Sequence, residues 1–257
     1  MSRTALVTGG ARGIGRGVAI ALADAGFDIA MLGLETLAES ETVVEAVKRH
    51  GQRAFYLQHD IAQIETFPAL VEEIQSALGP VDCLVNNAGV SSLRRSDLLD
   101  VATDSFDRSV AVNLRGTFFL TQAAARHMIA TPASAPQSRY RTIVTITSAN
   151  AEIIGPDRAD YCMTKAALAM MSKLFAARLA SESIHVFELR PGIIRTEMTL
   201  PATEKYDRLI ETGGVPIARW GTPDDIGTTV VALAEGKLPF STGEVINVGG
   251  GLHLHRL

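Results

Sequence analysis

The apolar positions of this chain fall into short runs that alternate with longer stretches of helical period. The short runs predict seven strands, at residues 4–8, 28–33, 53–58, 81–86, 142–147, 184–189 and 244–248. The longer stretches predict helices near residues 14–25, 38–49, 64–78, 104–129, 160–181 and 223–235. Because strand and helix alternate along the whole chain, the pattern predicts an α/β fold, a doubly wound parallel sheet with helices on both faces.

The same alternation bears on the number of domains. A length of 257 residues allows one large domain or two small ones. No segment resembles a linker; the nearest candidate, residues 131–138, is rich in Pro, Ala and Ser and is interpreted as a surface loop before a strand. Since the last predicted strand lies close to the C-terminus, we expect a single domain over residues 1–257.

Composition and charge exclude several classes of protein. The formal net charge is −4, which gives no electrostatic basis for binding nucleic acid. Two cysteines, Cys83 and Cys162, are too few for a disulfide framework and favour a reducing cytoplasm. The first residues do not resemble a signal peptide, and no run of about 18 apolar residues occurs. We therefore expect a cytoplasmic protein with no nucleic-acid or membrane partner.

A glycine-rich turn follows the first predicted strand. Residues 8–15 read Thr-Gly-Gly-Ala-Arg-Gly-Ile-Gly and lead directly into a predicted helix. A pyrophosphate needs close approach of the backbone and free N–H groups at a helix N-terminus, and Gly9, Gly13 and Gly15 permit both. In this strand–turn–helix context the glycines predict a dinucleotide site rather than a plain structural turn.

The choice between NAD and NADP depends on two charged residues. An acidic group near the end of the second strand favours NAD, and a basic group favours NADP. That strand ends at Gly33-Leu34 without a carboxylate, but Glu35 follows and could reach a ribose hydroxyl. Arg12, in the glycine turn, could instead pair with a ribose phosphate. The balance favours NADP, with NAD as the alternative.

Tyr161 and Lys165 are the leading candidates for acid–base chemistry. Their spacing of four places both side chains on one face of a predicted helix. A free phenol, with a pKa of roughly 10, is too weak an acid at neutral pH, and a nearby ammonium would lower that pKa. Tyr-x-x-x-Lys is common by chance, so the assignment depends on what else lies nearby.

Other polar residues follow predicted strands at the edge where a parallel sheet binds its ligands. Ser148 closes the strand at 142–147, and residues 86–89, Asn-Asn-Ala-Gly, close the strand at 81–86. Asn113 lies inside a predicted helix, where Asn is unfavourable by propensity, which hints at a packing or functional role.

Taken together and in order, these residues resemble the short-chain dehydrogenase/reductase family over essentially the whole chain, in particular its ketoacyl-carrier-protein reductase-like branch. The resemblance implies a Rossmann-type sheet of seven parallel strands, a dimer or tetramer, and the interconversion of an alcohol and a carbonyl compound with NAD(P). The matching motifs are the turn at 8–15, Asp60, residues 86–89, Asn113, Ser148, Tyr161, Lys165, Pro191-Gly192 and Thr196.

The resemblance also implies roles for the matching residues. Tyr161 would be the general acid or base, Lys165 would lower the pKa of Tyr161 and bind the nicotinamide ribose, and Ser148 would polarise the carbonyl. Asn113 would hold a water that links Lys165 to solvent. The expected cofactor contacts are Gly9, Arg12, Gly13, Ile14, Gly15, Gly33, Leu34, Asp60, Ile61, Asn87, Ala88, Gly89, Tyr161, Lys165, Pro191, Gly192, Ile194 and Thr196.

The substrate is less well defined by the sequence. In the family a region corresponding to residues 197–215 covers the substrate, and the pair Gly213-Gly214 suits a hinge; an ordinary surface excursion is the alternative. Hydrogen bonds to substrate are conceivable from Asn150 and Glu152, and contacts with an anionic group from Arg94 and Arg95.

Substrate class and catalysis itself leave alternatives open. The family's carrier-linked reductases place basic residues near their interface helices, where this chain has Pro132 and Glu182, so a small ketone, sugar or polyol is at least as suitable as a ketoacyl thioester. A cofactor-binding regulator or scaffold is the alternative to an enzyme. His253 and His255 lack acidic or cysteine neighbours, so we expect no metal site.

Overall fold

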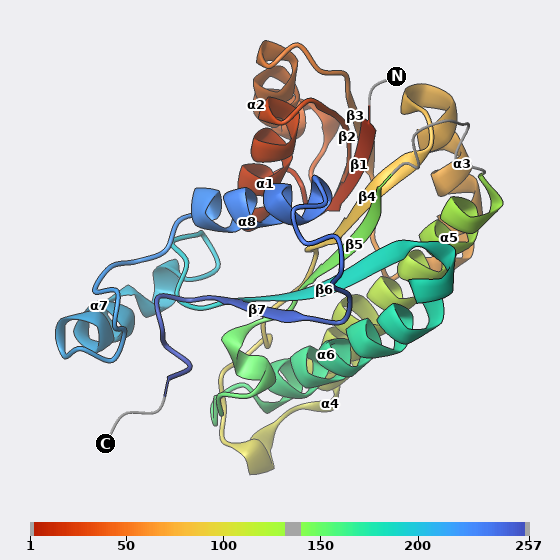
Figure 1. Cartoon of the computed structure of the whole chain (residues 1–257). Helices are drawn as coiled ribbons and strands as arrows, with labels where there is room; N and C mark the ends of the chain where they lie inside the picture. The colour runs from red at the N-terminus through yellow and green to blue at the C-terminus, as the bar shows by residue number, and fades with distance from the viewer. Residues whose placement is uncertain (1–2, 132–139, 255–257) are drawn as a thin grey trace.

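The computed structural model describes residues 3–131 and 140–254, and its centre is one parallel sheet (Figure 1). The seven strands lie in the order β3-β2-β1-β4-β5-β6-β7, and every neighbouring pair is parallel. Each predicted strand is present, and its first and last residues differ from the predicted ones by at most two positions. Their bounds are β1 Arg3–Thr8, β2 Phe27–Gly33, β3 Ala54–Gln58, β4 Val81–Asn86, β5 Arg141–Ile146, β6 Ile184–Pro191 and β7 Val245–Val248.

Helices cover both faces of the sheet, as predicted (Figure 1). Helices α1 (Gly13–Asp24), α2 (Leu37–Arg49) and α8 (Pro223–Ala234) pack on one face. Helices α3 (Phe67–Leu78), α5 (Thr117–Ala130) and α6 (Ala159–Leu179) pack on the other. Two shorter helices, α4 (Thr103–Ser109) and α7 (Thr203–Glu211), lie outside these layers. The arrangement is a doubly wound, Rossmann-type fold.

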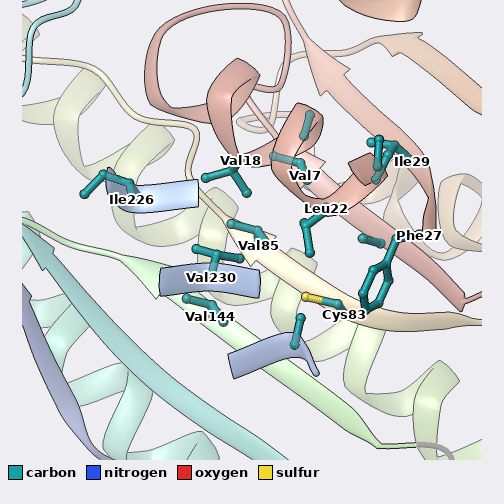
Figure 2. Close-up of a cluster of buried hydrophobic side chains, with 14 of the residues drawn as sticks. Val7, Val18, Leu22, Phe27, Ile29, Cys83, Val85, Val144, Ile226 and Val230 are labelled. Carbon is teal, nitrogen blue, oxygen red and sulfur yellow. The ribbon is translucent and has the colours of Figure 1, made fainter. Parts of the chain in front are cut away.

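Two layers of apolar side chains hold the helices to the sheet. In the layer shown in Figure 2, Val7, Cys83 and Val144 of the strands contact the apolar faces of α1 and α8. Strands β1, β2, β4 and β5 are buried along nearly their whole length, because helices exclude water from both faces. This explains why these strands are continuous apolar runs rather than alternating patterns.

Local chemistry fixes the start of α8. The Thr222 hydroxyl accepts from the Asp225 amide at 3.3 Å, and the Asp225 carboxylate accepts from the Thr222 amide at 2.7 Å. Pro223 occupies the first turn, where its missing N–H costs nothing. The spacing of these residues predicts this capping box, and the structure confirms it.

The predicted helix over 104–129 is present without a break, but it is not α-helical throughout. The segment is α4, then a π-helical turn at Val110–Gly116, then α5. Gly116 lies so close to the chain at Ile61 that an added Cβ would be 2.3 Å from the Ile61 carbonyl oxygen. The apolar periodicity does not reveal the wider turn, because it extends the helix by a residue without changing its polarity.

Two further expectations concern the loops and the membrane. The expected loop at 131–138 lies outside the described residues, apart from Thr131. In residues 3–131 and 140–254, the helices are too short or too polar to span a membrane.

Candidate active site

The candidate residues gather at the edge of the sheet where the strands end. The glycine turn follows β1, Asn87 to Gly89 follow β4, and Ser148 follows β5. Tyr161 and Lys165 lie in the first two turns of α6, which packs against the loop carrying Ser148. Parallel strands place these segments together, although they are up to 150 residues apart in sequence.

Tyr161 is a buried phenol whose pKa is raised by burial. A hydrogen bond with the Ser148 side chain and the positive charge of Arg158 both oppose that rise. The side chain is 9% exposed, so its hydroxyl is shielded from bulk water. In the structure, Ser148 and Arg158 therefore favour the phenolate, whereas the resemblance assigns this effect to Lys165.

Lys165 is a buried ammonium next to the phenol. Its Nζ atom lies 5.6 Å from the centre of the Tyr161 ring and donates to the Ile146 carbonyl oxygen at 3.0 Å. Burial lowers the pKa of Lys165 to about 8, and the negative charge of Glu188 opposes this. A partly destabilised buried cation next to Gly89 suits a lysine that hydrogen-bonds a ligand entering there.

Glu188 belongs to a buried network behind Ser148 that the sequence did not reveal. Its carboxylate accepts from the Thr147 hydroxyl at 2.7 Å and from Arg190 Nε at 2.6 Å. Arg190 also forms an ion pair with Glu152. Glu188 and Arg190 alternate with buried apolar residues on β6. This alternation is typical of an ordinary strand, so it gives no sign that the two residues have a role near the site.

The π-helical turn directs the Asn113 side chain inward. Its Oδ1 accepts from the Val90 amide at 2.7 Å, and its Nδ2 donates to the Val90 carbonyl at 2.9 Å and to Thr164 Oγ1 at 3.1 Å. Asn113 is fully buried and joins the loop after β4 to α6. Its expected role in holding a water stays a prediction.

Asp160 is a second residue that sequence reasoning missed. Its carboxylate accepts from Ser105 Oγ at 2.7 Å, Ser109 Oγ at 3.1 Å and the hydroxyl of Ser92. Burial alone would raise the pKa of Asp160, but these hydrogen bonds hold it below the usual range. Since Asp160 precedes Tyr161, this carboxylate fixes the start of α6 against α4 and the loop after β4.

The glycine turn has the form of a cradle for a phosphate group. Gly9 and Gly13 adopt positive φ values of 63° and 52°, which residues with a side chain rarely adopt. A Cβ on Gly15 would lie 2.0 Å from the Gly9 carbonyl oxygen. Asn87 Nδ2 donates to the Thr8 carbonyl at 2.9 Å and supports the turn from β4. No side chain caps the N-terminus of α1, so its N–H groups are available to an anion.

Charged residues at the end of β2 define the adenosine side of this cradle. Glu35 Oε1 lies 3.0 Å from Arg12 Nε, and the Tyr56 hydroxyl donates to the Glu35 carbonyl at 2.8 Å. The Glu35 side chain is 20% exposed, whereas that of Arg12 is 65% exposed. Burial raises the pKa of Tyr56 to about 12, and the nearby Glu35 carboxylate adds to the rise. A carboxylate is therefore held beside the end of β2, close to the glycine turn.

The remaining predicted cofactor residues lie around the same edge in different environments. Leu34 is 59% exposed, and Ile14 packs partly against the core. Asp60 accepts from the Ala62 amide at 2.9 Å, while the Ile61 side chain is buried in the core. Ile194 is also buried, whereas Thr196 lies opposite Gly13, with its Cγ2 atom 3.6 Å from where a Gly13 Cβ would be. Gly33, Ala88, Pro191 and Gly192 lie at or just beyond the ends of β2, β4 and β6.

The residues proposed for substrate contact have other partners. Asn150 Nδ2 donates to the Ile153 carbonyl at 2.8 Å, and Glu152 pairs with Arg190. Arg94 is 76% exposed and lies 3.5 Å from Asp104. Arg95 donates to Asp157 at 2.7 Å. Two of these residues lie near Tyr161: Asn150, whose backbone N–H donates to Ser148 Oγ at 3.1 Å, and Arg95, which shares Asp157 with Arg158.

Residues 197–215 contain α7, which stands out from the sheet in Figure 1. Tyr206 of α7 accepts a hydrogen bond from Arg158 Nη2 at 3.1 Å and packs edge-on against Trp220, with ring centres 5.7 Å apart. Trp220 Nε1 donates to Asp207 at 2.7 Å. The segment is thus connected to the start of α6 by one hydrogen bond near Tyr161.

Comparisons with known proteins identify the family of the chain. A family model described as enoyl-(acyl carrier protein) reductase matches residues 9–253. The chain is 34% identical over 254 residues to 3-oxoacyl-[acyl-carrier-protein] reductase FabG of Staphylococcus aureus, covering 99% of both. It is 33% identical over 250 residues to 2-dehydro-3-deoxy-D-gluconate 5-dehydrogenase of Escherichia coli, covering 97% of this chain and 94% of the relative.

Solved structures show the same fold. A 3-oxoacyl-[acyl-carrier protein] reductase from Brucella melitensis, in complex with NAD, is 43% identical with a TM-score of 0.95, covering 100% of this chain and 99% of that one. A short-chain type dehydrogenase/reductase from Mycobacterium marinum is 31% identical with a TM-score of 0.89, covering 98% and 96%.

Proposed function

Because the chain belongs to the short-chain dehydrogenase/reductase family and is an oxidoreductase acting on CH–OH groups with NAD(P), we propose that Tyr161, Ser148, Lys165 and Asn113 form its active site. The observation that carries the proposal is the buried Tyr161 phenol, hydrogen-bonded to Ser148 and adjacent to Lys165, at the sheet edge beside the glycine turn. A secondary alcohol and its ketone are interconverted there.

Each residue then has a task that its environment supports. Tyr161 exchanges a proton with the substrate oxygen, and Ser148 donates a hydrogen bond to that oxygen as it becomes negative. Lys165 hydrogen-bonds the ribose of the cofactor, and Asn113 fixes the distance between α6 and the loop after β4. The glycine turn, Asn87 and the N-terminus of α1 fit the cofactor's pyrophosphate, and the bound nicotinamide supplies hydride chemistry.

We further propose that the cofactor is NAD. The preference for NADP assumed an Arg12 that is free to meet a ribose phosphate, and Arg12 is instead paired with Glu35 at 3.0 Å. A carboxylate held beside the end of β2 accepts ribose hydroxyl groups and repels a phosphate. The relative from Brucella melitensis, solved with NAD, supports the proposal. The ratio of kcat/KM for NAD and NADP tests it; a preference for NADP would restore the opposite assignment.

Tyr161→Phe tests the catalytic proposal. Removing the hydroxyl removes the proton donor, so we expect kcat to fall by about 100-fold or more, the scale of general acid–base catalysis. Cofactor affinity, measured by nicotinamide fluorescence, should change little, because the ring still packs in place. Tyr140→Phe is a matched control, because Tyr140 lies immediately before β5, at the opposite end of the strands from the site. Near-normal turnover by Tyr161→Phe contradicts the proposal, and cofactor binding without turnover of any carbonyl by the native protein favours a binding protein.

We also propose that the protein works as a homo-oligomer. Met163, Met170 and Leu174 are 49–60% exposed on one side of α6, where a second copy of the chain would bury them. Light scattering coupled to size-exclusion chromatography measures the assembly; a monomer at micromolar concentration contradicts it.

A further inference from the structure

Positive charge gathers beside Tyr161 from three separate segments. Arg158 immediately precedes α6, Arg95 lies in the loop after β4, and Lys205 lies on α7. All three act electrostatically on one carboxylate, that of Asp157. The group therefore holds more positive than negative charge at the point where α7 approaches the catalytic helix.

Arg95 and Arg158 share the carboxylate of Asp157, and Arg95 holds it more closely. Asp157 Oδ2 accepts from Arg95 Nη1 at 2.7 Å, whereas Asp157 Oδ1 lies 3.7 Å from Arg158 Nε, beyond hydrogen-bonding distance. Arg158 donates one hydrogen bond in the described chain, to the neutral hydroxyl of Tyr206. The Arg158 side chain is 13% exposed. A largely buried cation without a hydrogen-bonded carboxylate is unfavourable, and an anionic ligand would stabilise it.

Arg158 lies close to Tyr161, the residue proposed to exchange a proton with the substrate. Its Cζ atom lies 6.0 Å from the centre of the Tyr161 ring. A substrate whose carbonyl oxygen meets the Tyr161 hydroxyl can therefore present a second group to the guanidinium. Tyr206 closes the far side, and its contact with Trp220 connects the site to the segment 197–215.

We propose, building on the proposed function, that Arg158 determines substrate specificity by binding a carboxylate a few bonds from the reacting carbon. The substrates would be oxo acids and the corresponding hydroxy acids. A planar guanidinium donates two parallel hydrogen bonds to a carboxylate, which fixes the orientation of the substrate as well as its affinity. Because Arg95 is hydrogen-bonded to Asp157, Arg158 is the guanidinium that faces the ligand, and a planar carboxylate matches its two parallel donors.

Steady-state kinetics with matched substrates test the proposal. Pyruvate, acetoacetate and levulinate differ in the distance between carbonyl and carboxylate, and each has a neutral methyl ester. We expect kcat/KM for the best acid to exceed that of its ester, and Arg158→Gln to lower it for the acid by about 10- to 100-fold, the scale of a hydrogen bond to a charged group. The ester should lose less than the acid, because it experiences only the effect of Arg158 on the pKa of Tyr161. Arg158→Lys should restore part of the loss, and Arg178→Gln, an exposed arginine at the other end of α6, should cause none.

A purely structural role for Arg158 predicts a different pattern. If Arg158 only connects α6 to Tyr206, then Arg158→Gln and Tyr206→Phe lower activity equally for acid and ester, which overturns the inference. A preference for dihydroxyacetone phosphate over every oxo acid overturns the carboxylate assignment. Efficient reduction of the esters, with no higher kcat/KM for the acids, contradicts the inference about Arg158 but is consistent with the proposed function.

Binding can be measured without turnover, because Trp220 is the single tryptophan of the chain and contacts Tyr206. Levulinate should produce a saturable change in Trp220 fluorescence in the protein with its cofactor, and methyl levulinate should not. The change should be lost in Arg158→Gln and kept in Arg178→Gln. Equal changes with acid and ester contradict the inference even if no substrate is turned over.

Discussion

The two ends of the proposed site, the cofactor end at the glycine turn and the substrate end at Tyr161, are held by different kinds of interaction. Around the glycine turn the geometry is set by the backbone: a Cβ on Gly15 would lie 2.0 Å from the Gly9 carbonyl oxygen, and Gly9 and Gly13 adopt positive φ values. Around Tyr161 the geometry is set by side chains from several elements, including the carboxylate of Asp160 and the guanidinium of Arg158. The first end is rigid because of sterics within one βα unit. The second end depends on polar contacts between segments that lie far apart in sequence.

The largest effect should follow from filling the backbone contact. In Gly15→Ala the new methyl group would lie 2.0 Å from the Gly9 carbonyl oxygen and 2.5 Å from Asn87 Nδ2. We expect the free energy of unfolding to fall by about 4 kcal/mol and cofactor affinity by more than tenfold, because the turn must open. Urea denaturation and cofactor titration measure the two effects.

Gly51→Ala is the control for this substitution. Gly51 has a φ of 78° but nothing within 4 Å of the position of a Cβ. Its substitution tests backbone strain alone and should cost about 1 kcal/mol without affecting cofactor affinity. A Gly15→Ala protein as stable as Gly51→Ala would show that the turn is not sterically fixed.

A somewhat smaller loss should follow from removing the carboxylate behind Tyr161. Asp160→Ala leaves three serine hydroxyls without their buried acceptor, so we expect the free energy of unfolding to fall by about 3 kcal/mol. kcat should fall while cofactor affinity stays close to normal, because the displaced element is the start of α6. Asp104→Ala, an exposed site, should change stability by less than about 0.5 kcal/mol. Equal losses of kcat and cofactor affinity would contradict the division into two ends.

The smallest effect concerns the pH dependence of stability. Burial lowers the pKa of Lys165 from its ordinary 10.5 to about 8, so between these values the unfolded chain binds more protons than the folded one. Stability therefore gains from this group as pH rises, by about 2 kcal/mol between pH 7.5 and 9.5. Lys165→Met should lack the gain, and Lys173→Met, an exposed lysine of the same helix, should keep it. Urea denaturation at pH 7.5 and 9.5 compares them; identical slopes in all three proteins would contradict the burial of a charged Lys165.

The two ends also differ in how far the sequence alone predicted them. The glycine turn and the capping box at Thr222 depend on residues within eight positions of one another, so their local pattern was sufficient. The pair Tyr161 and Lys165 was predictable for the same reason, from helical spacing. Arg158 and Tyr206 are 48 residues apart, and their contact depends on how α7 folds back. Asp160 is missed because a carboxylate at the start of a helix is unremarkable until its three serine donors are located.

The choice between NAD and NADP likewise depends on a contact that the sequence does not reveal. Both Glu35 and Arg12 were identified from the sequence, but their effect depends on whether they are paired with each other. That pairing depends on Tyr56, which holds the backbone of Glu35 from the neighbouring strand. Residue types alone cannot show it.

The wide turn at Val110–Gly116 makes chain length, rather than residue identity, the critical variable in one segment. Each residue of an α-helix rotates its side chain by about 100° around the axis, so deleting one residue here would rotate α5 by that angle relative to α4. Leu120 and Ala124 would leave the apolar layer, or Asn113 would turn away from Val90. Single-residue insertions and deletions, which surface loops tolerate easily, would here separate the active-site amide from the core that supports it.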